Sequence, residues 1–160
     1  MGREKSADVE TQTVFGAIRQ YASRVKHTPD HVRVLVVDDE ANVRSFVERA
    51  LRIAGYETVS APGGHEALAV ARTTSGGFDL VVTDVRMPYM SGPQLIERLR
   101  RNERDVKVLY LTGHNDQLFK EKIGLWEDEA FLDKPCGMNA LIEAVSLLLN
   151  GRLPPSNRAA

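Results

Sequence analysis

The sequence predicts an α/β fold in which a parallel sheet of five strands is covered by helices on both faces. Two alternating patterns predict it. Short runs rich in valine and leucine are separated by longer segments in which apolar residues recur every three or four positions. The short runs are typical of strands buried on both faces, and the longer segments are typical of amphipathic helices. Because the two patterns alternate over roughly 120 residues, we expect crossover helices and a three-layer domain.

Each expected element has its own sequence signals. The strands share apolar runs, most of them β-branched, and are expected at Arg33–Val37, Glu57–Ser60, Asp79–Thr83, Val106–Leu111 and Glu129–Asp133. The helices share apolar residues at helical spacing and are expected at Ala41–Ala54, Gly64–Thr74, a segment that starts at Ser91 and Pro93, Asn115–Trp126 and Met138–Asn150. In the first of these helices the residues expected to point inward are Val43, Phe46, Val47, Ala50, Leu51 and Ala54.

Residues 1–30 precede this alternation and are expected to form an N-terminal extension. Their apolar positions recur at helical intervals, at Val14, Ile18, Tyr21 and Val25. This stripe predicts an extra helix at about 11–27, which either lies on its own domain, continues an upstream helix or serves as a dimerisation helix. We therefore expect a main domain at 31–150 and a flexible tail at 151–160.

Composition excludes several classes of function. The net charge is −1, so no strongly basic field points to nucleic acid or to an anionic membrane. The sequence has no apolar run near the ~20 residues of a membrane span, and its N-terminus lacks the apolar core of a secretory signal. The single cysteine, Cys136, excludes an internal disulfide and fits a reducing compartment, which indicates the cytoplasm.

Polar side chains that carry chemistry stand at the ends of four expected strands. Asp38 and Asp39 follow the first strand, and Asp84 comes at the end of the third. Thr112 follows the fourth strand and Lys134 the fifth. Because the carboxyl ends of parallel strands share one edge, we expect these groups to converge. Taken singly, either aspartate of the pair or Thr112 could instead be a helix N-cap, and Lys134 could be a solvated strand end.

With these residues in place, the sequence resembles the receiver domain of bacterial two-component response regulators. The resemblance covers about residues 32–150 and rests on motifs in the family's order, namely Leu35–Glu40, Asp84 with Met87–Pro88, Thr112–Gly113 and Lys134–Pro135. Each motif alone is weak, but their joint placement at strand ends is specific. The resemblance implies the flavodoxin-like strand order 2-1-3-4-5. In folds of this kind the functional site lies at the carboxyl ends of the strands, where the strand order reverses.

The resemblance also implies a site and a metal. Asp84 is the expected phosphoacceptor, and Thr112 and Lys134 are expected to contact the phosphoryl group. A divalent cation would relieve the repulsion among the carboxylates, and Mg²⁺ suits oxygen ligands, with Mn²⁺ as an alternative. The expected metal ligands are Asp38, Asp39, Asp84 and the backbone carbonyl of Arg86.

Further positions are carried over from the family by their place in the motifs. Thr112 and Phe131 are the expected switch residues. Arg86, Gly113 and His114 are expected to flank the path by which a phosphodonor or water reaches the site. One stretch, 123–129, departs from the family's usual pattern, and its tryptophan could lie either in the core or on the surface.

The function implied is a phosphorylation-activated signalling switch. The protein is not expected to be a conventional enzyme, since it would catalyse only its own aspartyl phosphorylation and dephosphorylation. A histidine kinase or histidine phosphotransfer protein would donate the phosphoryl group, and a changed helix 4–strand 5–helix 5 surface would control a downstream protein partner. No DNA-binding domain is expected in this chain. Whether the protein forms a homodimer is left open.

Two arrangements fit this function, a single-domain regulator and the receiver of a hybrid kinase. Other classes compete with it. A degenerate receiver would only bind a partner, but the full set of site residues argues against it. A haloacid-dehalogenase-like phosphatase would need a second aspartate where Arg86 stands. Flavodoxin-type cofactor binding is disfavoured because the acidic cluster would repel a flavin phosphate.

Overall fold

The computed structural model describes residues 31–113, 116 and 128–151. Its strands form one parallel sheet in the order β2-β1-β3-β4-β5. The strands are β1 (Arg33–Val37), β2 (Glu57–Ala61), β3 (Leu80–Asp84), β4 (Lys107–Thr112) and β5 (Glu129–Asp133). The described helices are α2 (Ala41–Ile53), α3 (Gly64–Thr73), α4 (Gly92–Leu99) and α6 (Met138–Asn150). The predicted fold class and strand order are confirmed.

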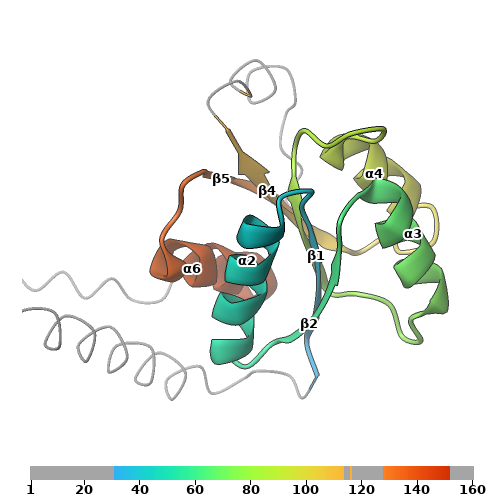
Figure 1. Cartoon of the computed structure of the whole chain (residues 1–160). Coiled ribbons are helices and arrows are strands. Elements are labelled where there is room, and N and C mark those ends of the chain that lie inside the picture. The colour runs from blue at the N-terminus through green and yellow to red at the C-terminus, as the bar shows by residue number, and fades with distance from the viewer. Residues whose placement is uncertain (1–30, 114–115, 117–127, 152–160) are drawn as a thin grey trace, which may run out of the picture.

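The sheet forms the middle of three layers. Helices α2 and α6 cover one face, and α3 and α4 cover the other (Figure 1). In β1, Val34 and Val36 pack toward α2 and α6, whereas Leu35 and Val37 pack toward α3 and α4. Both faces of this interior strand are therefore buried, which explains why its sequence is apolar throughout instead of alternating.

The element bounds agree with prediction to within a residue where the structure describes them. The expected helices at about 11–27 and at 115–126 lie outside the described residues, apart from Asp116, and so does nearly all of the tail. Among the residues that are described, no helix combines the length and the apolar character that crossing a membrane requires.

The inward face of α2 is narrower than the sequence pattern predicted. Val47, Ala50 and Leu51 are buried, but Phe46 is 36% exposed, so its assignment to the core was wrong. Phe46 lies one position before Val47, which places it about 100° around the helix. At that angle it falls outside the strip that the sheet and α6 cover.

The start of α4 is held tightly against the end of β3. The backbone amide of Gln94 donates to Ser91 Oγ (3.3 Å), and the backbone amide of Ser91 donates to Gln94 Oε1 (3.1 Å). This capping box confirms the predicted helix start. The amide of Gly92 donates to the carbonyl of Val85 (2.9 Å), and a Cβ on Gly92 would overlap the backbone oxygen of Asp84. The glycine therefore permits a close approach that positions the end of β3.

Candidate functional site

Three carboxylates from the adjacent strands β1 and β3 meet at the carboxyl edge of the sheet. One oxygen of each of Asp38, Asp39 and Asp84 lies within 4.8 Å of the others. Asp38 and Asp84 are buried, and Asp39 is exposed. Because β1 and β3 pair directly, the residues that follow Val37 stand beside the end of β3. The predicted convergence of the carboxylates is therefore present.

The turn into α2 orients Asp38. The backbone amide of Glu40 donates to Asp38 Oδ1 (2.9 Å), and Arg44 Nη1 donates to the Asp38 carbonyl (2.7 Å). The N-cap of α2 is Glu40, whose side chain makes no capping hydrogen bond. Neither aspartate is thus the N-cap residue, and the second oxygen of Asp38 faces the acidic cluster.

Lys134 brings the only ammonium that the described residues place on this cluster. Its Nζ lies 2.8 Å from Asp38 Oδ2 and 3.3 Å from Asp84 Oδ2. The peptide bond from Lys134 to Pro135 is cis, and the Lys134 amide donates to the carbonyl of Thr112 (2.8 Å). The lysine side chain is 19% exposed, so it is not a solvated strand end.

The pKa values at this cluster show which charges are balanced. Burial raises the pKa of Asp84 to about 6; Lys134 opposes this rise, and the nearby Asp38 and Asp39 add to it. Burial alone would lower the pKa of Lys134, but its hydrogen bond and attraction to Asp38 and its attraction to Asp84 outweigh burial and raise it. The ammonium is therefore well neutralised, whereas the carboxylate of Asp84 retains an unfavourable charge.

Thr112 is fully buried at the end of β4, and its hydroxyl is directed toward β5. Thr112 Oγ1 donates to Asp133 Oδ1 at 2.7 Å, across a pair of residues that face each other in the sheet register. Since a threonine hydroxyl has a single proton to donate, that proton is given to Asp133 and not to Asp84. Sequence reasoning missed Asp133, although its position opposite Thr112 follows from aligning the two strand ends.

The loops after β3 and β4 are tied together by a buried carboxylate. Asp116 Oδ2 accepts a hydrogen bond from the backbone amide of Gly113 (2.7 Å), and Asp116 Oδ1 lies 2.7 Å from Arg86 Nε. The Asp116 side chain is 4% exposed and that of Arg86 67%. The sequence predicts a metal-ligand role for the backbone carbonyl of Arg86 and a position beside the access path to the site, so the ion pair between its side chain and Asp116 is an addition.

Residues 34–146 match the family described as the response regulator receiver domain. The chain belongs to this family. Two solved structures resemble the receiver closely. The receiver domain of the hybrid histidine kinase CckA has a TM-score of 0.62 and 34% identity, and the match covers 73% of this chain and 98% of that one. The response regulator TrrA of Thermotoga maritima, in complex with Mg²⁺ and BeF, has a TM-score of 0.63, 34% identity and the same coverage.

In two curated relatives, the segment that matches this chain is part of a larger protein. The sensor kinase CckA of Brucella abortus (strain 2308) is 36% identical over 116 residues, which are 72% of this chain and 12% of the kinase. The transcriptional regulatory protein PrrA of Mycobacterium tuberculosis (strain ATCC 25618 / H37Rv) is 35% identical over 122 residues, which are 75% of this chain and 51% of the regulator. The chain thus spans about half of one relative and a small part of the other.

Phe131 of the receiver is half-buried on the face of the sheet that α3 and α4 cover. Its ring packs against that of Tyr110, with centroids 5.6 Å apart and an interplanar angle of 35°. The contact between the two rings follows from the β4–β5 register, which pairs Tyr110 with Phe131 just as it pairs Thr112 with Asp133. His114 and Trp126 lie outside the described residues, so their predicted roles stay predictions.

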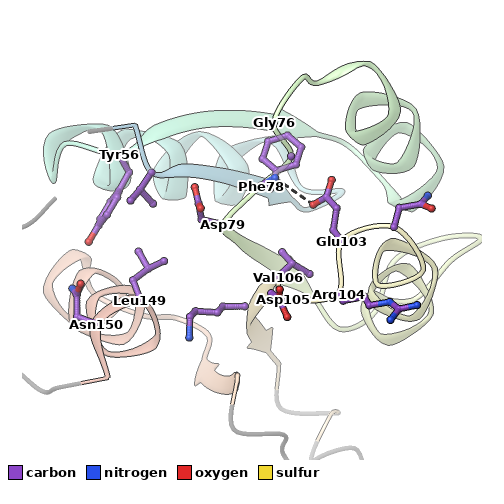
Figure 2. Close-up of a pocket in the computed structure, with 14 residues that line it drawn as sticks. Tyr56, Gly76, Phe78, Asp79, Glu103, Arg104, Asp105, Val106, Leu149 and Asn150 are labelled. Atoms are coloured by element: carbon purple, nitrogen blue, oxygen red, sulfur yellow. Dashed lines mark hydrogen bonds between the residues drawn. The ribbon is translucent and has the colours of Figure 1, made fainter. Parts of the chain in front are cut away.

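A separate pocket of about 460 Å³ lies at the amino ends of the receiver's strands, opposite the ends that carry the acidic cluster (Figure 2). Residues just before three strands line it, including Val32, Asp79 and Val106, and the end of α6 closes it. The amide of Phe78 donates there to Glu103 Oε2 (3.2 Å). The pocket is far from the strand ends that carry the acidic cluster, so it is not the receiver's candidate site.

Replacing Arg86 by methionine is expected to lower the free energy of unfolding of the receiver by about 1–2 kcal/mol. The substitution keeps an unbranched but shorter side chain and leaves the buried carboxylate of Asp116 without its guanidinium partner. The exposure of Arg86 keeps the effect below that of a fully buried pair. Urea unfolding measures the change. Adding Asp116→Asn should recover part of the loss, and a wild-type midpoint for Arg86→Met alone would show that the ion pair contributes nothing.

Proposed function

We propose that this receiver is a phosphorylation-activated signalling switch in which Asp84 accepts a phosphoryl group from a histidine kinase or histidine phosphotransfer protein. The observation that carries the proposal is the buried Asp84 carboxylate beside two other carboxylates and the ammonium of Lys134. An oxygen of Asp84 would attack phosphorus while the bond from phosphorus to the donor's imidazole nitrogen breaks. The products are an acyl phosphate on Asp84 and a free histidine on the donor.

The acidic cluster fits a hard divalent cation. Its donor atoms are all carboxylate oxygens, and their mutual repulsion contributes to the raised pKa of Asp84. Asp38, Asp39 and Asp84 would hold Mg²⁺ together with the backbone carbonyl of Arg86, and Mn²⁺ is an alternative ion. When bound, the cation supplies charge neutralisation for the phosphoryl oxygens. The resemblance to TrrA, solved with Mg²⁺ and BeF, supports this assignment.

The remaining residues would stabilise and read the phosphorylated state. Lys134, already in contact with Asp84, would pair with one phosphoryl oxygen, and the hydroxyl of Thr112 would donate to another. The inward movement of Thr112 would let Phe131, which packs against Tyr110 in this structure, change its position. Arg86, with Gly113 and His114, would govern how readily water removes the group. The receiver thus acts on itself and is not a conventional enzyme.

The repacking would change the helix 4–strand 5–helix 5 surface expected for the family, to which β5 and α6 would contribute. A downstream protein would recognise this surface, either as a separate partner or as another part of a longer chain. The relatives include both a sensor kinase and a transcriptional regulator, which supports either arrangement. We place the receiver in the cytoplasm, where Cys136 stays a reduced thiol, and a homodimer is an alternative form of output.

The direct test is phosphorylation by acetyl phosphate, followed by intact-protein mass spectrometry. With Mg²⁺ we expect one added phosphoryl group per chain, and with a chelator we expect none. A phosphorylated histidine phosphotransfer protein serves as a second donor. A receiver that takes up no phosphoryl group from either donor would be a degenerate module that only binds a partner.

A further inference from the structure

We infer that Asp133 is a positioning residue that holds the receiver in its resting state by binding the hydroxyl of Thr112. The inference rests on the proposed function, because it concerns how the same site passes from the resting to the phosphorylated state. It assigns a regulatory role to a residue outside the phosphoacceptor, the metal ligands and the lysine.

The geometry places Thr112 between two competing acceptors. Strand β4 lies between β3 and β5, so Thr112 has Asp84 near the end of one neighbouring strand and Asp133 at the end of the other. In this structure Thr112 Oγ1 donates a hydrogen bond to Asp133 Oδ1 at 2.7 Å. Thr112 is 0% exposed, so water has little access to its hydroxyl, whereas Asp133 is exposed and its carboxylate also meets solvent. A rotation of the side chain about its Cα–Cβ bond would redirect the proton from one strand to the other.

The backbone of Thr112 is held in place, so the side chain of Thr112 is the part that can move. The Lys134 amide donates to the Thr112 carbonyl at 2.8 Å, and Thr112 is paired with Asp133 in the sheet register. Two consecutive residues of the same strand end therefore act on the site in opposite directions. Lys134 reaches toward Asp84, whereas Asp133 withdraws the hydroxyl that a phosphoryl group on Asp84 would need.

The charge of Asp133 decides the strength of this bias. A hydroxyl bonds more strongly to a carboxylate than to a neutral acceptor. A phosphoryl group must therefore offset the loss of a charge-assisted hydrogen bond before Thr112 can turn inward. The receiver with Asp133 would occupy the activated state less readily than a receiver without a carboxylate there, which is a shift between two populations.

The test is a double-mutant cycle on the affinity for beryllofluoride, an acyl-phosphate mimic, in the presence of Mg²⁺. Isothermal titration calorimetry would compare wild type, Asp133→Ala, Thr112→Val and the double variant. We expect Asp133→Ala to bind beryllofluoride about tenfold more tightly than wild type. In the Thr112→Val background the same change should alter the affinity less than about twofold, because no hydroxyl remains to be released.

Two controls separate the hydrogen bond from simple charge and from folding. Glu143→Ala removes an exposed carboxylate from α6 and should leave the affinity unchanged. In metal-free protein, the urea midpoints of the same four proteins should show coupling between Thr112 and Asp133. An equal gain from Asp133→Ala in both Thr112 backgrounds would make the effect one of charge alone and overturn the inference. Absence of coupling in urea would overturn it as well.

The outcomes also separate this inference from the proposed function. If wild type binds beryllofluoride and takes up a phosphoryl group, but Asp133→Ala binds no more tightly, only the role of Asp133 is wrong. If wild type neither binds beryllofluoride nor takes up a phosphoryl group from either donor, the proposed function fails and the inference fails with it.

Discussion

Asp84→Asn is expected to take up no phosphoryl group from acetyl phosphate, while the receiver remains folded. The amide keeps the shape of the carboxylate but lacks the anionic oxygen that attacks phosphorus. Intact-protein mass spectrometry after incubation with Mg²⁺ and acetyl phosphate measures the uptake. The matched control is Asp105→Asn, which changes an exposed aspartate at the opposite edge of the sheet and should behave as wild type. Uptake by Asp84→Asn at the wild-type level would place the acceptor on another residue.

The same substitution is expected to stabilise the metal-free receiver at pH 7 by about 2 kcal/mol. The pKa of Asp84 is raised from 3.8 to about 6, so the folded state binds its proton more tightly than the unfolded state does. This carboxyl therefore favours folding fully below about pH 4, and its contribution is lost as the pH rises toward 6. Urea unfolding at pH 7 and pH 4 should show a gain for Asp84→Asn at the higher pH only.

Gly92→Ala is expected to lower the free energy of unfolding by about 3 kcal/mol and to impair phosphoryl uptake as well. The added Cβ would overlap the backbone oxygen of Asp84, and backbone atoms at the end of a central strand have little freedom to move. Relief of the overlap would shift either the start of α4 or the phosphoacceptor itself. Urea unfolding measures the first effect, and phosphorylation under conditions where the variant is folded measures the second.

Gly137→Ala is the matched control for this prediction. Gly137 also stands at the start of a helix, as the N-cap of α6, but an added Cβ would meet no atom within 4 Å. We expect this variant to lose less than about 1 kcal/mol, since alanine is only a poorer N-cap than glycine. If Gly92→Ala were as stable as Gly137→Ala, the close approach of α4 to β3 would not exist in solution.

The fold and the convergence of the acidic cluster could be predicted because both follow from strand identity. Apolar, β-branched runs identify the buried strands, and parallel pairing brings their ends together whatever the connecting loops do. Asp38, Asp84 and Lys134 stand at such ends, and for them proximity follows from topology alone. Their roles came from the family resemblance, and those roles remain proposals.

Features that depend on a single side-chain rotation or loop path could not be predicted. The sequence places Thr112 at a strand end, but the choice of Asp133 as its acceptor depends on one torsion angle. The ion pair between Arg86 and Asp116 joins two loops whose paths no periodicity describes. The exposure of Phe46 depends on how far the neighbouring elements extend around α2, which a hydrophobic stripe overestimates.

The pocket at the amino edge of the sheet has a consequence for how such a unit can be combined with others. Val32, where the described chain enters β1, and Asn150, where it leaves α6, both line that pocket. The points of covalent attachment are thus neighbours, and both lie away from the carboxylates. A unit with adjacent attachment points can be inserted into another protein or appended to it without rearranging its interior. Such a unit can therefore be joined to different neighbouring domains through the pocket edge, away from the acidic cluster.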